Sequence, residues 1–153
     1  IFLSQSTGAQ WGAGQRRLGV AGCLLVGIFE EYLFRGALLD GLRARIGAAR
    51  GALASSLIFT VYHVRPQAIA AWPHIFLTGA VFANLRLRGM GLASLALIHA
   101  AVDSAFFFVG KESVREYGTS YWVFLAGLFA YAAATHAPDP MKHPLVDAKS
   151  DSG

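Results

Sequence analysis

Residues 18–39, with the sequence LGVAGCLLVGIFEEYLFRGALL, decide the fold of this chain. The stretch is apolar over about 20 residues, which is the length that a membrane-spanning α-helix needs. It nevertheless contains Glu30, Glu31 and Arg35. Charged groups inside such a helix are costly, starting at about 2.5–3.5 kcal/mol each at the centre of a bilayer. We therefore expect this helix to turn its charged side chains toward other protein helices.

Four further apolar segments follow, so the sequence predicts an all-α, multi-pass transmembrane bundle with about five spans. The composition agrees, because 55% of the 153 residues are hydrophobic and 14% are charged, whereas about a quarter of the residues of a soluble domain are charged. The expected partner is a lipid bilayer. We find no basic stripe interleaved with aromatic residues, which argues against a nucleic-acid partner. The five segments are 18–39, 51–65, 69–88, 90–110 and 119–136, and the longest loop between the first three is 40–50.

The chain divides into a core at 18–110, an additional transmembrane helix at 119–136 and a tail at 137–153. The tail is polar and holds three of the five prolines, so we expect it to be disordered. The first residue is Ile1 and not Met. We therefore expect the chain to be a fragment or a processed product.

The polar residues of the first segment fall on two parts of its surface. Residues four apart share one helix face, and small residues on that face allow another helix to approach closely. Glu31 and Arg35 are four apart in the order that favours an ion pair, whereas Glu30 has no cation within its own helix. The row on this face comprises Gly19, Cys23, Gly27, Glu31 and Arg35.

Two other segments also carry polar residues in or beside rows of small residues. His63 ends such a row in the second segment, and His99 and Asp103 lie four apart in the fourth. We therefore expect Glu30, His63 and His99 to converge in one cavity. The remaining polar residues of interest are expected at interfaces between helices (Asn84, Thr78) or at the membrane interface (His74).

Three short stretches resemble a known family. Residues 30–35 (EEYLFR), 59–63 (FTVYH) and 99–103 (HAAVD) are similar, in this order, to the motifs Glu-Glu-x-x-x-Arg, Phe-x-x-x-His and His-x-x-x-Asn/Asp of the CAAX-protease and bacteriocin-processing family, called CPBP or Abi. The resemblance covers roughly 18–110. Because members of this family usually have more helices, we expect N-terminal spans to be missing here.

The resemblance implies an intramembrane endopeptidase that hydrolyses a peptide bond of a membrane-associated substrate. That substrate would be a CAAX-type, leader or sorting-signal peptide. We expect an integral membrane location, in the inner membrane of a bacterium.

The resemblance also assigns roles to single residues. Glu30 would be the catalytic glutamate that activates water, and His63 its partner on that water. His99 and Asp103 would face the scissile carbonyl, where His99 could donate to the oxyanion. Glu31 and Arg35 would be supporting residues. Because an ionised aspartate only accepts hydrogen bonds, Asp103 is expected either to be protonated or to accept from a ring nitrogen of His99 and hold its orientation.

Zinc catalysis is the close alternative, because Glu30, His63, His99 and Asp103 are also a plausible zinc set. We favour the glutamate mechanism, with no cofactor and with zinc as the alternative. A non-catalytic membrane protein is the other alternative. It could be a bacteriocin immunity factor or a proton-coupled transporter, since buried Glu and His residues also serve in proton relays.

Overall fold

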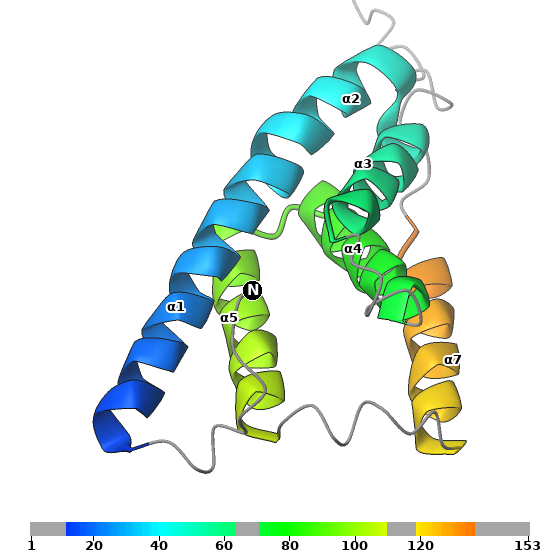
Figure 1. The fold of residues 1–153 in the computed structure, drawn as a ribbon. Coiled ribbons are helices and arrows are strands. Elements are labelled where there is room, and N and C mark those ends of the chain that lie inside the picture. The colour runs from blue at the N-terminus through cyan, green and yellow to red at the C-terminus, as the bar shows by residue number, and fades with distance from the viewer. Residues whose placement is uncertain (1–11, 64–70, 110–118, 137–153) are drawn as a thin grey trace, which may run out of the picture.

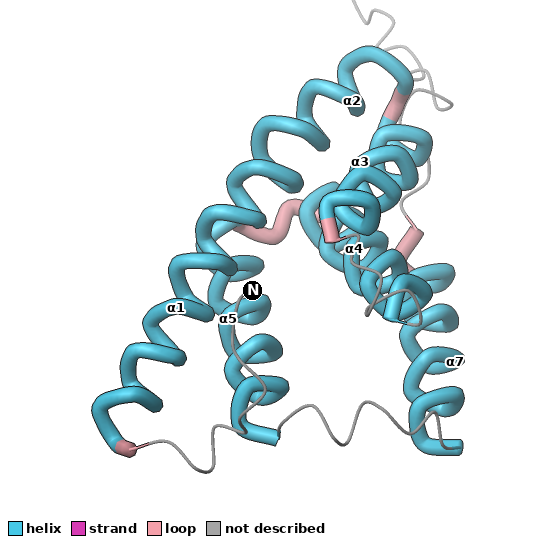
Figure 2. Tube along the Cα trace, in the orientation of Figure 1, coloured by secondary structure: helices cyan, strands magenta, loops and turns pink. Residues whose placement is uncertain are grey.

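The chain is helical throughout the part that can be described. The computed structural model describes residues 12–63, 71–109 and 119–136, and these form helices and short turns without a strand (Figure 2). The all-α prediction is therefore confirmed. The expected disordered tail at 137–153 lies outside the described residues.

The N-terminal part forms one long rod (Figure 1). It consists of α1 (Ala13–Glu31), the π-helical segment η2 (Tyr32–Leu38) and α2 (Leu39–Ile46). The predicted loop at 40–50 is therefore wrong. Its two arginines suit a helix that ends here, because they lie in the last turn of α2, where they complement the helix dipole. The chain reverses at Gly47, whose φ of 86° suits a residue without a Cβ.

Within the described residues, four more helices follow, namely α3 (Ala48–Tyr62), α4 (Trp72–Leu87), α5 (Leu92–Val109) and α7 (Thr119–Ala134). Helix α5 packs along α1, α3 contacts both α2 and α4, and α7 covers α4 (Figure 1). The start of α4 has a proline in its first turn, where the missing N–H does no harm.

Helix α1 approaches α5 closely because small residues face each other. A Cβ added at Gly27 would lie 2.7 Å from the carbonyl oxygen of Ala96, so no larger residue fits there without movement. Helices α4 and α7 are joined by Asn84, whose amide donates to the carbonyl of Ala132 at 3.0 Å. The predicted interhelical hydrogen bond of Asn84 is thus confirmed.

Among residues 12–63, 71–109 and 119–136, no helix combines the length and the apolar character that crossing a membrane requires. Helices α3, α4 and α7 have 15, 16 and 16 residues, and α1 includes four charged residues. The prediction of about five membrane spans is therefore not confirmed.

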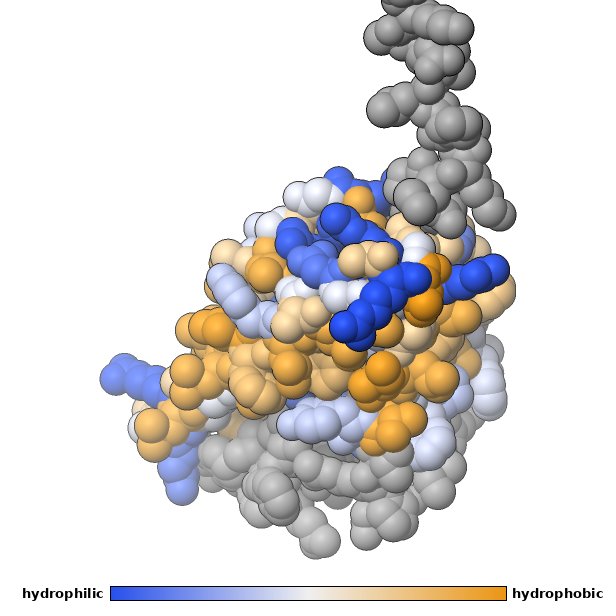
Figure 3. Space-filling model, turned by 90° about the horizontal axis from the view of Figure 1, so that it is seen from above, coloured by the Kyte–Doolittle hydropathy of each residue, from blue (hydrophilic) through white to orange (hydrophobic). Residues whose placement is uncertain are grey.

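Much of the described surface is nevertheless apolar. Large side chains such as Leu18, Leu25 and Val123 are 75%, 68% and 66% exposed. Figure 3 shows hydrophilic residues gathered over one part of the surface and a broad hydrophobic area beside them. Soluble monomers rarely expose large contiguous apolar patches. We therefore expect another molecule to cover these apolar side chains.

Candidate active site

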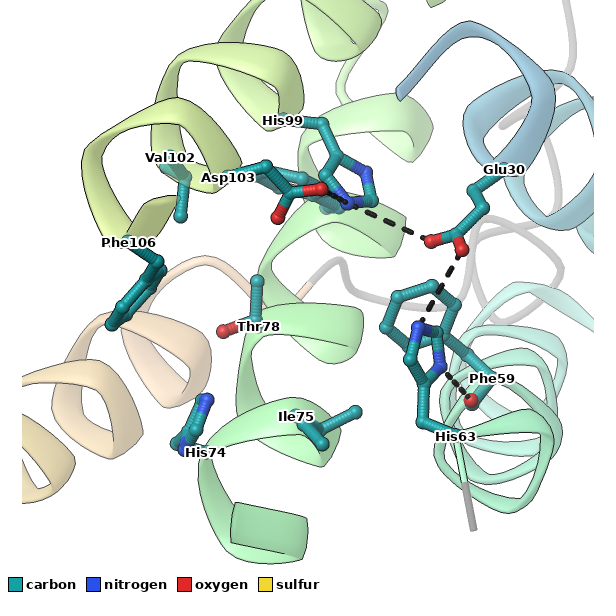
Figure 4. A pocket seen from close by; sticks show the side chains of 11 residues that line it. Glu30, Phe59, His63, His74, Ile75, Thr78, His99, Val102, Asp103 and Phe106 are labelled. Carbon is teal, nitrogen blue, oxygen red and sulfur yellow. Dashed lines mark hydrogen bonds and ion pairs between the residues drawn. The ribbon is translucent and has the colours of Figure 1, made fainter. Parts of the chain in front are cut away.

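A pocket of about 280 Å³ lies between α1, α3, α4 and α5 (Figure 4). Its polar end contains the four residues expected at the site: Glu30, His63, His99 and Asp103. Three helices therefore deliver these side chains to one place, as the three rows of small residues led us to expect. The other end is mainly apolar.

Glu30 is the centre of the polar end. Its side chain comes from the last turn of α1, and the residue is only 5% exposed. Oε1 lies 3.5 Å from Nε2 of His63, and Oε2 lies 3.6 Å from Nε2 of His99. These distances exceed those of direct hydrogen bonds, and Oε2 has no hydrogen-bond partner among the described residues. The geometry leaves Glu30 able to take a bridging water.

His63 is fixed by the end of the helix that precedes it. It is the C-terminal cap of α3, and its Nδ1 lies 2.8 Å from the carbonyl oxygen of Phe59. A carbonyl only accepts, so Nδ1 carries the proton and donates. The ring also packs against the Phe59 ring, with centroids 4.4 Å apart. Nε2 is thereby directed at Glu30.

Glu31 holds both Arg35 and His99. Its Oε1 accepts a hydrogen bond from Nη1 of Arg35 at 3.0 Å and one from Nδ1 of His99 at 2.7 Å. The predicted ion pair with Arg35 is confirmed, whereas the bond to His99 was not predicted. Because Glu31 fixes Nδ1, the other ring nitrogen of His99 faces the pocket.

Arg35 ties the long rod to the two helices beside it. Its guanidinium lies 4.3 Å from the ring centroid of Phe59 on α3 and 5.4 Å from that of Phe82 on α4, distances typical of cation–π contacts. Nη2 also donates to the carbonyl of Gly79 at 3.4 Å. The residue is 1% exposed, so Arg35 and Glu31 form a buried support beneath the pocket.

The π-helical turn of η2 begins directly after Glu31, and π turns are frequent at functional sites. Side chains from neighbouring helices satisfy two of its carbonyls. Ser55 donates to Phe34 at 2.9 Å, and Arg86 donates to Arg35 at 3.4 Å. These bonds attach η2 to α3 and α4 just after the two glutamates.

Asp103 is placed at the pocket but does not orient His99. Its Oδ2 lies 3.7 Å from Nε2 of His99 and has no hydrogen-bond partner within the described part of the chain. Of the two alternatives expected for Asp103, the hydrogen bond accepted from His99 is therefore not formed, and the protonated form stays a prediction. Glu31 takes that position, because the packing of α1 against α5 brings it to Nδ1.

Three residues of α4 line the pocket, namely His74, Thr78 and Phe82. The expectation that His74 lies at a membrane interface did not anticipate this position. The three residues are four apart, so they share one helix face. That spacing is the signal in the sequence that could have placed them on one face.

A zinc site would need several of these donor side chains to point at one ion. Across the described ranges, no group of three or more His, Cys, Asp or Glu side chains is arranged so that it could hold a metal ion. Measurement of the metal bound to the purified protein tests the zinc alternative.

Comparisons with known proteins agree with the motifs. Residues 14–105 match the family described as type II CAAX prenyl endopeptidase Rce1-like. A segment of 78 residues, 50% of this chain, is 35% identical to an uncharacterized 24.3 kDa protein of Escherichia coli and spans 36% of that protein's length. No solved structure matches. Because the family match extends over more than half of the 153 residues and includes all three motifs, the chain belongs to the Rce1-like family of type II CAAX prenyl endopeptidases.

Proposed function

We propose that this chain forms the core of an intramembrane endopeptidase that uses a glutamate-activated water. The observation that carries the proposal is the position of Glu30, buried between two imidazoles at the end of a pocket, with one carboxylate oxygen unpartnered among the described residues. The family name indicates the substrate class, a membrane-associated peptide with a prenylated CAAX-type end.

The reaction follows from the orientation of the side chains. A water between Glu30 and His63 would give a proton to the Glu30 carboxylate while its oxygen attacks the scissile carbonyl. His99 would donate from Nε2 to the oxyanion when its ring carries both protons. The proton on Glu30 would then pass to the leaving amine, which returns the carboxylate to its starting state.

A membrane location is supported by the family and by the exposed apolar side chains of α1, α3, α5 and α7. Lipid would cover these side chains and bring a lipid-modified substrate to the same surface. We propose a bacterial inner membrane, in keeping with the Escherichia coli relative.

The test is cleavage of a farnesylated CAAX peptide by the full chain purified in lipid nanodiscs, followed by mass spectrometry in ¹⁸O-labelled water. We expect one ¹⁸O atom in the new carboxylate. Glu30→Gln should lower the rate by about 10²–10⁴-fold, since it removes a general base. Asp40→Asn is the matched control, because this carboxylate is 47% exposed and lies outside the pocket. Cleavage by Glu30→Gln at the parent rate would contradict the proposal.

A further inference from the structure

One imidazole that lines the pocket, that of His74 on α4, has no role in the proposed chemistry. His74 lies at the end away from Glu30, close to Ile75, Thr78 and Phe106 (Figure 4). Its ring stacks on Phe106, with centroids 6.3 Å apart and an interplanar angle of 23°. Its Nδ1 is buried and has no hydrogen-bond partner among the described residues.

An unpartnered nitrogen at this position requires an explanation. Leaving a buried polar group without a partner costs about 1–3 kcal/mol, and a phenylalanine would supply the same stacking without that cost. Because the residue lines a pocket, a molecule bound there could supply the missing partner. A prenyl chain has no hydrogen-bonding group, whereas every peptide unit offers one donor and one acceptor. The peptide part of a substrate therefore fits either tautomer of His74.

The surroundings of His74 match a peptide as well. Ile75, Val102 and Phe106 form apolar walls around it, and ligand pockets typically combine such walls with a few polar groups. The volume of about 280 Å³ lies near the lower end of the usual range for ligand pockets. Glu30 and His74 line the same pocket, so a short stretch of peptide bound in it would contact both residues.

We propose that His74 is a substrate-binding residue that hydrogen-bonds the peptide main chain, beside an apolar subsite formed by Ile75, Val102 and Phe106. This inference rests on the proposed peptidase function and adds to it a residue that fixes the position of the peptide. The apolar subsite takes a side chain of the peptide segment that His74 binds. Thr78, one turn along α4, offers a hydroxyl to the same bound segment.

The test compares His74→Phe with His74→Gln in the full chain, using the farnesylated peptide. Phenylalanine keeps the stacking but cannot hydrogen-bond, whereas glutamine loses the ring but keeps a donor and an acceptor. We expect His74→Phe to raise KM about fivefold to tenfold, the size of one lost hydrogen bond, with kcat changed less than about twofold. His74→Gln should restore most of the affinity. His136→Phe, at an exposed position outside the pocket, is the matched control.

Binding measured in the Glu30→Gln background makes the result independent of turnover. There, His74→Phe should weaken the Kd for the peptide by about the same factor. An unchanged KM and Kd in His74→Phe, or a loss in His74→Gln that phenylalanine does not show, would mean that the ring only stacks and would overturn this inference alone. If the parent protein does not cleave the peptide and does not bind it, the proposed function and this inference both fail.

Discussion

Glu30 and Glu31 are neighbours in the chain, but they lie in two different regions. Glu31 lies in the buried contact between α1 and α5, whereas Glu30 lines the pocket. Glu31 is 0% exposed and is bonded through one oxygen to both Arg35 and His99. Glu30 faces the pocket, and its distances to the two histidines are 3.5 Å and 3.6 Å. Oε2 of each glutamate has no hydrogen-bond partner among the described residues. The difference is that Glu31 is fixed through Oε1 by two charge-assisted bonds, whereas Glu30 makes no such bond and faces the pocket.

The difference shows how one helix can separate support from chemistry. Consecutive residues of a helix point in directions about 100° apart, so Glu31 faces the contact with α5 while Glu30 faces the space between α3 and α5. His99 belongs to both regions, because Nδ1 meets Glu31 and Nε2 meets Glu30. Glu31 therefore acts on the pocket through other residues: it orients His99 directly, and it holds Arg35 against the rings of Phe59 and Phe82.

The largest effect on stability is expected from Glu31→Gln. The change removes the charge that Arg35 and His99 share, and losing one partner of a buried ion pair costs about 3–5 kcal/mol. Melting curves in detergent should show this loss, and cleavage should fall too because His99 loses its anchor. Glu30→Gln is the matched control, with a melting temperature near that of the parent.

If Glu30→Gln and Glu31→Gln lower the melting temperature by the same amount, the two glutamates do not differ in their structural role. Equal residual cleavage in both variants would contradict the division between support and chemistry in the same way.

A smaller effect is expected at Gly27, which sets the spacing between Glu31 and His99. A Cβ there would press on the backbone of α5, 2.7 Å from the carbonyl oxygen of Ala96. Gly27→Ala should therefore lower the free energy of unfolding by about 1–3 kcal/mol, as overpacking does. It should also reduce cleavage, since it displaces His99 from the rod.

Gly22→Ala is the control for Gly27→Ala, because it lies in the same helix and its Cβ would meet nothing within 4 Å. Alanine is the better helix former by about 0.8–1.0 kcal/mol, so Gly22→Ala should be neutral or stabilising. If both variants behave alike in melting and cleavage, close packing at Gly27 does not position the site.

Much of this arrangement could be predicted from local spacing. Small and polar residues four apart showed which helix faces meet, and the pairing of Glu31 with Arg35 follows from their separation alone. The prediction of a loop at 40–50 was wrong, because the charged residues of this stretch are compatible with the end of a helix as well as with a loop. Spacing along one helix does not distinguish between these two cases.

The contacts between helices were harder to predict, since they depend on how each helix is rotated against its neighbours. The bond from His99 to Glu31 joins residues 68 positions apart. The π turn after Glu31 and the place of His74 in the pocket also result from packing. The spacing of His74, Thr78 and Phe82 indicated a shared face, but it did not indicate that this face lines the pocket.

The smallest effect is expected from Asp103→Asn, and this variant distinguishes the glutamate mechanism from the zinc mechanism. Asp103 lines the pocket together with Glu30. Its Oδ2 lies 3.7 Å from Nε2 of His99 and has no hydrogen-bond partner among the described residues. Glu31 already fixes the ring of His99, so the charge of Asp103 is not needed for that purpose.

In the glutamate mechanism, Asp103→Asn should retain cleavage within about tenfold of the parent, because the amide can donate to the oxyanion and Glu31 still holds the ring of His99. Asp103→Leu removes every polar contact of this side chain and should lower cleavage far more.

If zinc were the catalyst and Asp103 one of its ligands, the asparagine variant would exchange a charged ligand for a poor neutral one, and its metal affinity and cleavage would fall together. Cleavage rates and metal content of the parent and both variants distinguish these outcomes. An inactive asparagine variant that has lost a metal present in the parent would refute the glutamate mechanism. An active asparagine variant without stoichiometric metal would leave Glu30 as the group that activates water.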